Sequence, residues 1–143
     1  MNTNKETDSL GSKSLSPREA IEFIEEQGVK FIDLQFTDLP GRLQHMTIPV
    51  RQLKEETFVE GVPKLDGSSI KGFVGIHESD LMMKPDPSTL AIMSWSPENV
   101  KAARFVCDIY WGLGGGRLDW DPRAIAQKAE AEVKNQGYDF SYW

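Results

Sequence analysis

The sequence contains little cysteine and little histidine, and this limits the chemistry that it can perform. Its single cysteine, Cys107, excludes an internal disulfide and a zinc site built from several cysteines, and it fits a reducing cytosol. Phe105 and Ile109 flank this cysteine at strand spacing, which predicts a buried, unreactive thiol. The two histidines, His45 and His77, lack the i, i+4 spacing of a helical ligand pair, so no metal site is predicted from them.

Basic charge and long apolar runs are also scarce. The 143 residues carry a net charge of −6, whereas a nucleic-acid-binding domain shows a basic face. No apolar run approaches the roughly 20 residues that a membrane-spanning helix needs. Residues 1–14 have no apolar stretch typical of a secretory signal, and we expect them to form a flexible tail. The length fits one soluble domain without internal repeats.

The chain after this tail predicts a helix followed by a hairpin. Ser16 and Glu19 have the spacing of a capping box, Pro17 suits the first helical position, and Gly28 suits the end of the helix. An apolar stripe on this helix consists of Ala20, Ile21 and Ile24. Alternating residues predict strands at 29–37 and 42–50, joined by a turn at 38–41.

The second half predicts two further strands and a helix. Residues 51–60 indicate a short helix that Gly61 ends, and prolines argue against regular structure at 85–88. Strands are predicted at 89–95 and 100–111, with Cys107 on the core face of the longer one. Asp121 suits the N-cap of a last helix. The residues predicted to face the core from this helix are Ile125, Ala126, Ala129 and Val133. The fold class is therefore α+β, a mixed sheet with helices packed on one face.

The stretch from 65 to 81 carries the main candidate for chemistry. Asp66 is followed by small residues, so its carboxylate is approachable. At about 4 Å and an effective dielectric constant of about 20, such a charge gains about 4 kcal/mol with a small cation before desolvation. The carboxylate could also accept a proton from that cation. The alternative is that Asp66 caps its own loop through the backbone of Ser68 or Ser69.

Other motifs predict less. Ser68, Ser69 and His77 are not placed in a G-x-S-x-G nucleophile elbow. Glycines at 112–116 follow a strand, but the G-x-G-x-x-G spacing is absent and no helix begins there, so a hairpin-type loop is favoured over a dinucleotide site. Asp86 lies between two prolines, which is typical of a turn.

The spacing of several motifs resembles the N-terminal signature of type I glutamine synthetase. The run Asp66-Gly67-Ser68-Ser69 is followed after eight residues by Glu78-Ser79-Asp80, and Met83 supplies the next apolar position. The flanking sequence is similar to that family at 36–42, at 83–87 and at Asp121-Pro122-Arg123. The resemblance covers about residues 15–143.

The resemblance implies a fold, a reaction and roles for particular residues. Residues 15–137 would form a β-grasp domain, and 138–143 would begin a catalytic domain. The family's enzymes are cytoplasmic dodecamers that use ATP and Mg²⁺ or Mn²⁺ to join ammonia to the γ-carboxylate of glutamate, and each active site lies between two subunits. Asp66 would help bind ammonium and take its proton, and Ser69 would complete that site. Phe73 would reach over the neighbour's nucleotide site. The residues that would shape this loop are Gly67, Ser68, Gly72 and Asp80.

The sequence also departs from the family pattern. It ends at Trp143, where the family's catalytic domain begins, so we expect that this chain alone binds no cofactor or metal and catalyses no reaction. Gly75 stands where some feedback-inhibited members carry arginine, which argues against glutamine feedback at that position. Two alternatives stay open: a domain of a related γ-glutamyl-amine ligase, and a β-grasp module that binds a partner without catalysis.

Overall fold

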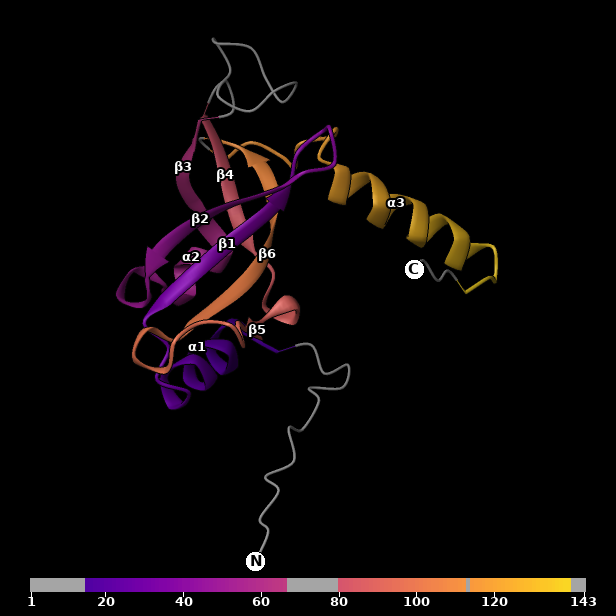
Figure 1. The fold of residues 1–143 in the computed structure, drawn as a ribbon. Helices are drawn as coiled ribbons and strands as arrows, with labels where there is room; N and C mark the ends of the chain where they lie inside the picture. The colour runs from indigo at the N-terminus through magenta and orange to yellow at the C-terminus, as the bar shows by residue number, and fades with distance from the viewer. Residues whose placement is uncertain (1–14, 67–79, 113, 140–143) are drawn as a thin grey trace, which may run out of the picture.

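A six-stranded mixed sheet forms the centre of the structure, which is a computed structural model (Figure 1). The structure describes residues 15–66, 80–112 and 114–139, without the side chains of 64–66 and 80. The strand order is β2-β1-β6-β4-β3, and the short β5 also pairs with β6. The strands are β1 (Phe31–Thr37), β2 (Leu43–Pro49), β3 (Val62–Asp66), β4 (Asp80–Pro85), β5 (Ala91–Ile92) and β6 (Ala102–Trp111). This architecture confirms the predicted α+β class.

Two helices pack on one face of the sheet, and a third leaves the domain (Figure 1). They are α1 (Pro17–Glu26), α2 (Glu55–Glu60) and α3 (Pro122–Asn135), with 3₁₀ turns at η1 (Val50–Gln52), η4 (Pro87–Thr89) and η5 (Glu98–Val100). The capping box of α1 is present, because the Glu19 backbone N–H donates to Ser16 Oγ and the Ser16 backbone N–H donates to Glu19 Oε2. Gly28, just after this helix, has the predicted positive φ of 67°.

The core lies between the sheet and the helices α1 and α2. Alternate residues of β1 and β6 point into it, which the period-two pattern of both strands predicts. The ring of Phe58 from α2 meets that of Phe105 from β6 edge to face, with centroids 5.4 Å apart. Other members of the core include Ala20, Ile24, Ile32, Leu34, Leu81, Met83 and Ile109.

Three predictions about the elements are wrong. The strand predicted at 89–95 is only the two-residue β5, preceded by η4, which occupies part of the segment predicted to be irregular. The stretch from 65 to 81 was predicted to be loop throughout, yet β3 and β4 reach into both of its ends. Strand pairing with β6 supplies hydrogen bonds that local sequence does not reveal.

The predicted core face of α3 is the third error. Ile125 is 52% exposed, and Ala126 and Ala129 are exposed too, whereas the buried residue of this helix is Ala124. The helix begins against the sheet and then extends away from it, so its apolar residues have no sheet to cover among the described residues (Figure 1).

Gly61 provides a test of the packing between α2 and β4. Its φ of 87° and ψ of 177° suit glycine alone, and an added Cβ would lie 3.1 Å from the Met83 carbonyl oxygen. We expect Gly61→Ala to lower the free energy of unfolding by about 1–3 kcal/mol in urea denaturation. Gly116→Ala is the matched control, because Gly116 has no positive φ and open space around it. Equal stability of the two variants would contradict this account.

Candidate functional site

The root of the candidate loop is a strand pair. The β3–β4 ladder ends with Leu65 opposite Leu81 and Asp66 opposite Asp80. The structure therefore brings the backbones of Asp66 and Asp80 together at one edge of the sheet. These two residues flank the segment 67–79. The other predicted site residues, Gly67, Ser68, Ser69, Gly72 and Phe73, lie outside the described residues.

Strand β4 holds this root against the core. It lies between β3 and β6, and its side chains Leu81 and Met83 are buried. Leu81 is opposite Trp111 in the ladder, and the Trp111 ring meets that of Trp120 edge to face at a centroid distance of 5.5 Å. The root of the loop thus consists of the edge strand β3 and the interior strand β4, which holds it against the core.

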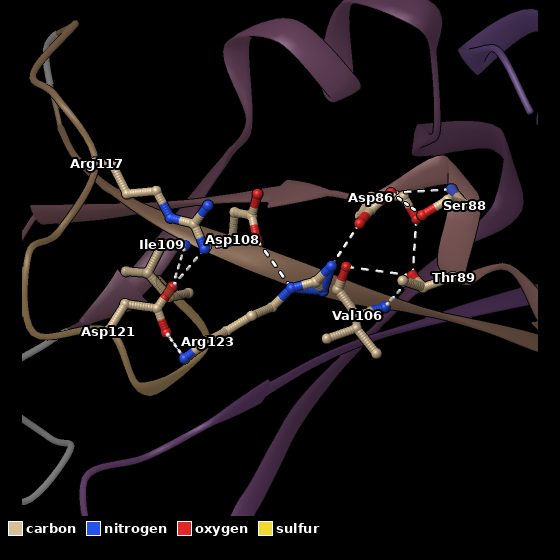
Figure 2. A network of polar contacts seen from close by, with 9 residues as sticks. All are labelled: Asp86, Ser88, Thr89, Val106, Asp108, Ile109, Arg117, Asp121 and Arg123. Carbon is tan, nitrogen blue, oxygen red and sulfur yellow. Dashed lines mark hydrogen bonds and ion pairs between the residues drawn. The ribbon is translucent and has the colours of Figure 1, made fainter. Parts of the chain in front are cut away.

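A network of charged side chains lies on the opposite face of the same strands (Figure 2). Asp108 of β6 accepts a hydrogen bond from Arg117 Nη2 at 2.8 Å, and its Oδ1 lies 3.1 Å from Arg123 Nε. Arg123 Nη2 also donates to Asp86 Oδ2, just after β4. Burial raises the pKa of the Asp108 carboxyl, and the two guanidinium groups act in the opposite direction. Two arginines therefore join three separate parts of the fold.

Asp121 connects this network to the start of α3. It is fully buried, and its Oδ1 accepts a hydrogen bond from the Arg123 backbone N–H at 3.1 Å, which confirms the predicted N-cap. Its Oδ2 accepts from Arg117 Nη2 at 3.1 Å and from the Ile109 backbone N–H at 3.4 Å. One carboxylate thus caps the helix and fixes it to β6.

Sequence reasoning found only part of this network. It predicted the cap at Asp121 and the turn at Asp86, where Oδ1 accepts a hydrogen bond from the Ser88 backbone N–H. It missed the two arginines. The motif Asp121-Pro122-Arg123 and the outward position of Asp108 were visible signals, but nothing local indicates that Arg123 bonds to a residue 37 positions earlier.

A second polar cluster surrounds Asp33 on β1. Its Oδ1 accepts hydrogen bonds from His45 Nδ1 and Thr47 Oγ1, both at 2.8 Å, and its Oδ2 accepts from Gln35 Nε2 at 2.9 Å. Burial acts to raise the pKa of Asp33, but these hydrogen bonds outweigh it and hold the pKa below its usual range. The cluster joins β1 to the edge strand β2 and places His45 in a structural role.

The described residues otherwise offer little reactive chemistry. Cys107 is buried, and burial raises its pKa to about 12, in agreement with the predicted unreactive thiol. Within the described ranges, no three residues among His, Cys, Asp and Glu are grouped so that they could hold a metal ion. In that same part of the chain, no helix is long and apolar enough to cross a membrane. The two polar clusters join β1 to β2, and α3 to β6 and the end of β4.

Comparison with known proteins agrees with this geometry. The family model described as glutamine synthetase, β-grasp domain, matches residues 28–112, more than half of the chain. The chain belongs to the glutamine synthetase β-grasp family. It is 48% identical over 120 residues to the glutamine synthetase of Sulfolobus acidocaldarius, a match that covers 84% of this chain and 25% of that protein. Against the glutamine synthetase of Aquifex aeolicus, the identity is 43% over 122 residues, covering 85% of this chain and 25% of the relative.

Solved structures show the same fold. The cryo-EM structure of Plasmodium falciparum glutamine synthetase aligns with a TM-score of 0.74 and 27% identity, over 87% of this chain and 24% of that one. A GmaS/ADP complex aligns with a TM-score of 0.71 and 21% identity, over 82% of this chain and 26% of that one, which supports the fold alone. The chain thus spans about a quarter of the length of the glutamine synthetases that it matches.

The Asp33 cluster predicts a pH-dependent contribution to stability. Because the folded-state pKa is lowered, the contribution is present above the unfolded value of about 3.9 and is lost as the pH falls through the folded value. We expect Asp33→Asn to lower the free energy of unfolding by about 1–3 kcal/mol at pH 7, since an amide cannot accept all three hydrogen bonds. Urea denaturation at pH 7 and near pH 3 should show this difference shrinking in acid.

The control for this experiment is Asp119→Asn. Asp119 is exposed and pairs with the exposed Lys128, so its removal should leave stability nearly unchanged at both pH values. A difference between Asp33→Asn and the parent that is the same at both pH values would contradict the assigned role of the carboxylate.

Proposed function

We propose that this chain is the N-terminal domain of a glutamine synthetase and that it contributes the ammonium-side loop to the active site of a neighbouring subunit. The main support for this proposal is the family match at residues 28–112. The β3–β4 ladder that ends at Asp66 and Asp80 adds to it. The complete enzyme would form glutamine from glutamate, ammonia and ATP. In this proposal the chain alone is not a catalyst.

The position of Asp66 supports this role. It is the last paired residue of β3, so its backbone is fixed by the ladder. A residue whose backbone is already fixed can contribute to a site without the entropic cost of ordering its own backbone first. Asp66 would bind ammonium and accept its proton, and Ser69 would complete the site. Phe73 would lie over the nucleotide site of the neighbour.

The remaining components belong to the complete enzyme. The described residues do not provide a group of metal ligands, so we assign ATP and Mg²⁺ or Mn²⁺ to the catalytic region of the assembled protein. The relatives are about four times as long as this chain's matching part, which leaves room for that region. We propose that the complete enzyme is a cytoplasmic homo-oligomer, a dodecamer in the family pattern, because the loop would otherwise have no reaction centre to serve.

A chimeric enzyme tests this proposal. Residues 15–137 of this chain would replace the matching segment of the Sulfolobus acidocaldarius glutamine synthetase, with which the chain shares 48% identity. We expect ATP-dependent glutamine formation by the parent chimera. Asp66→Ala should lower kcat/KM for ammonium at least about tenfold, which corresponds to about 1.4 kcal/mol of lost transition-state stabilisation.

Asp119→Asn is again the matched control, because it removes an exposed carboxylate from the same domain. Unchanged kcat/KM for ammonium in Asp66→Ala would contradict the role of Asp66. An assembled but inactive parent chimera would contradict the proposed function itself. Preference for a larger primary amine over ammonium would instead support the γ-glutamyl-amine ligase alternative.

A further inference from the structure

The buried attachment of helix α3 to the domain lies in its first turn and in the segment before it. After β6 the chain turns back, and the Leu118 backbone N–H donates to the Ile109 carbonyl at 2.9 Å. Leu118 and Asp121 are fully buried, and Ala124 is nearly so. The rest of the helix extends away from the sheet (Figure 1). Its direction therefore depends on contacts made within its first turn.

A groove separates the following part of the helix from the sheet. It has a cavity volume of about 510 Å³ and lies between Thr37, Thr89 and Val106 on one side and α3 on the other. Residues of α3 that line it include Pro122, Arg123, Ala126, Gln127 and Glu130. Because this groove is open, backbone attachment at Asp121 alone would leave the helix free to change its angle about its first turn.

Arg123 lines that groove, and its side chain reaches from α3 to carboxylates beside the strands. Its guanidinium group contacts Asp86 through Nη2 and Asp108 through Nε, and its side chain is only 20% exposed (Figure 2). The two carboxylates come from the end of β4 and from β6. A planar guanidinium that binds two fixed carboxylates restrains orientation as well as distance. The same contacts thus fix the helix to the strand that begins at Asp80.

We propose that Arg123 is a positioning residue that sets the direction of α3 relative to the β3–β4 hairpin. This inference rests on the proposed function, in which the catalytic region follows α3 while the hairpin carries Asp66 to the neighbour's reaction centre. Both connections must be aligned for the assembly to form a complete site. The Arg123 contacts with Asp86 and Asp108 hold that alignment in each subunit.

Spin-label distances in this chain test the direction of the helix. Labels on Glu56→Cys in α2 and Ala131→Cys in α3 would occupy exposed positions, and buried Cys107 would not compete for the reagent. We expect a narrow distance distribution in the labelled parent. Arg123→Met and Asp86→Asn should each broaden it, since each removes one side of the ion pair. Lys128→Met is the control, because Lys128 is on the same helix and its exposed pair with Asp119, which precedes the helix, does not reach the sheet.

The chimeric enzyme tests the consequence for catalysis. Arg123→Met should lower kcat/KM for ammonium at least about fivefold with little change in KM for ATP, while Arg123→Lys should restore part of the loss. Unchanged distance distributions in both Arg123→Met and Asp86→Asn would overturn the inference, as would broadened distributions with unchanged kinetics. Failure of the proposed function would be recognised separately, by an assembled but inactive parent chimera.

Discussion

Pairing along both sides of β6 is the constraint on which the rest of the structure depends. This strand pairs with β1 in parallel, and with β5 and β4 in antiparallel fashion along its other edge. Its inward residues, such as Phe105, form the core, and outward Asp108 holds the arginines that attach α3. A shift of one residue in its register would exchange these two faces, so core and ion network depend on one alignment.

Much of the fold could be predicted because its signals are local. The capping box of Ser16 and Glu19, the turn that begins at Asp38 and the alternation of β6 each depend on residues within a few positions of one another. Asp38 shows this directly, since it accepts hydrogen bonds from the Arg42 backbone N–H at 2.7 Å and from Gln44 Nε2 at 2.9 Å. Because its hydrogen bonds join residues close together in the chain, such a turn can be predicted from the sequence.

The remainder depends on contacts between distant residues. Strand β3 contains Pro63 and Lys64, which do not favour strands, and it exists because β4 pairs with it. The apolar residues of α3 follow a helical period, but periodicity does not show whether a second surface is present to cover them. Within the candidate site, the motif around Asp66 could be recognised in the sequence. The contact between Asp86 and Arg123 could not be predicted, because only the folded topology brings these distant residues together.

The rung formed by Asp66 and Asp80 also sets a geometric limit. A fully extended chain advances about 3.4 Å per residue, so Ser69 can lie no more than about 10 Å from Asp66. Phe73 is seven residues from either end of the rung, which limits its reach to about 24 Å. The ammonium position would therefore stay close to the end of the sheet. In the proposed assembly, the neighbouring subunit would have to bring its reaction centre to this hairpin, so subunit spacing would become a determinant of catalytic geometry.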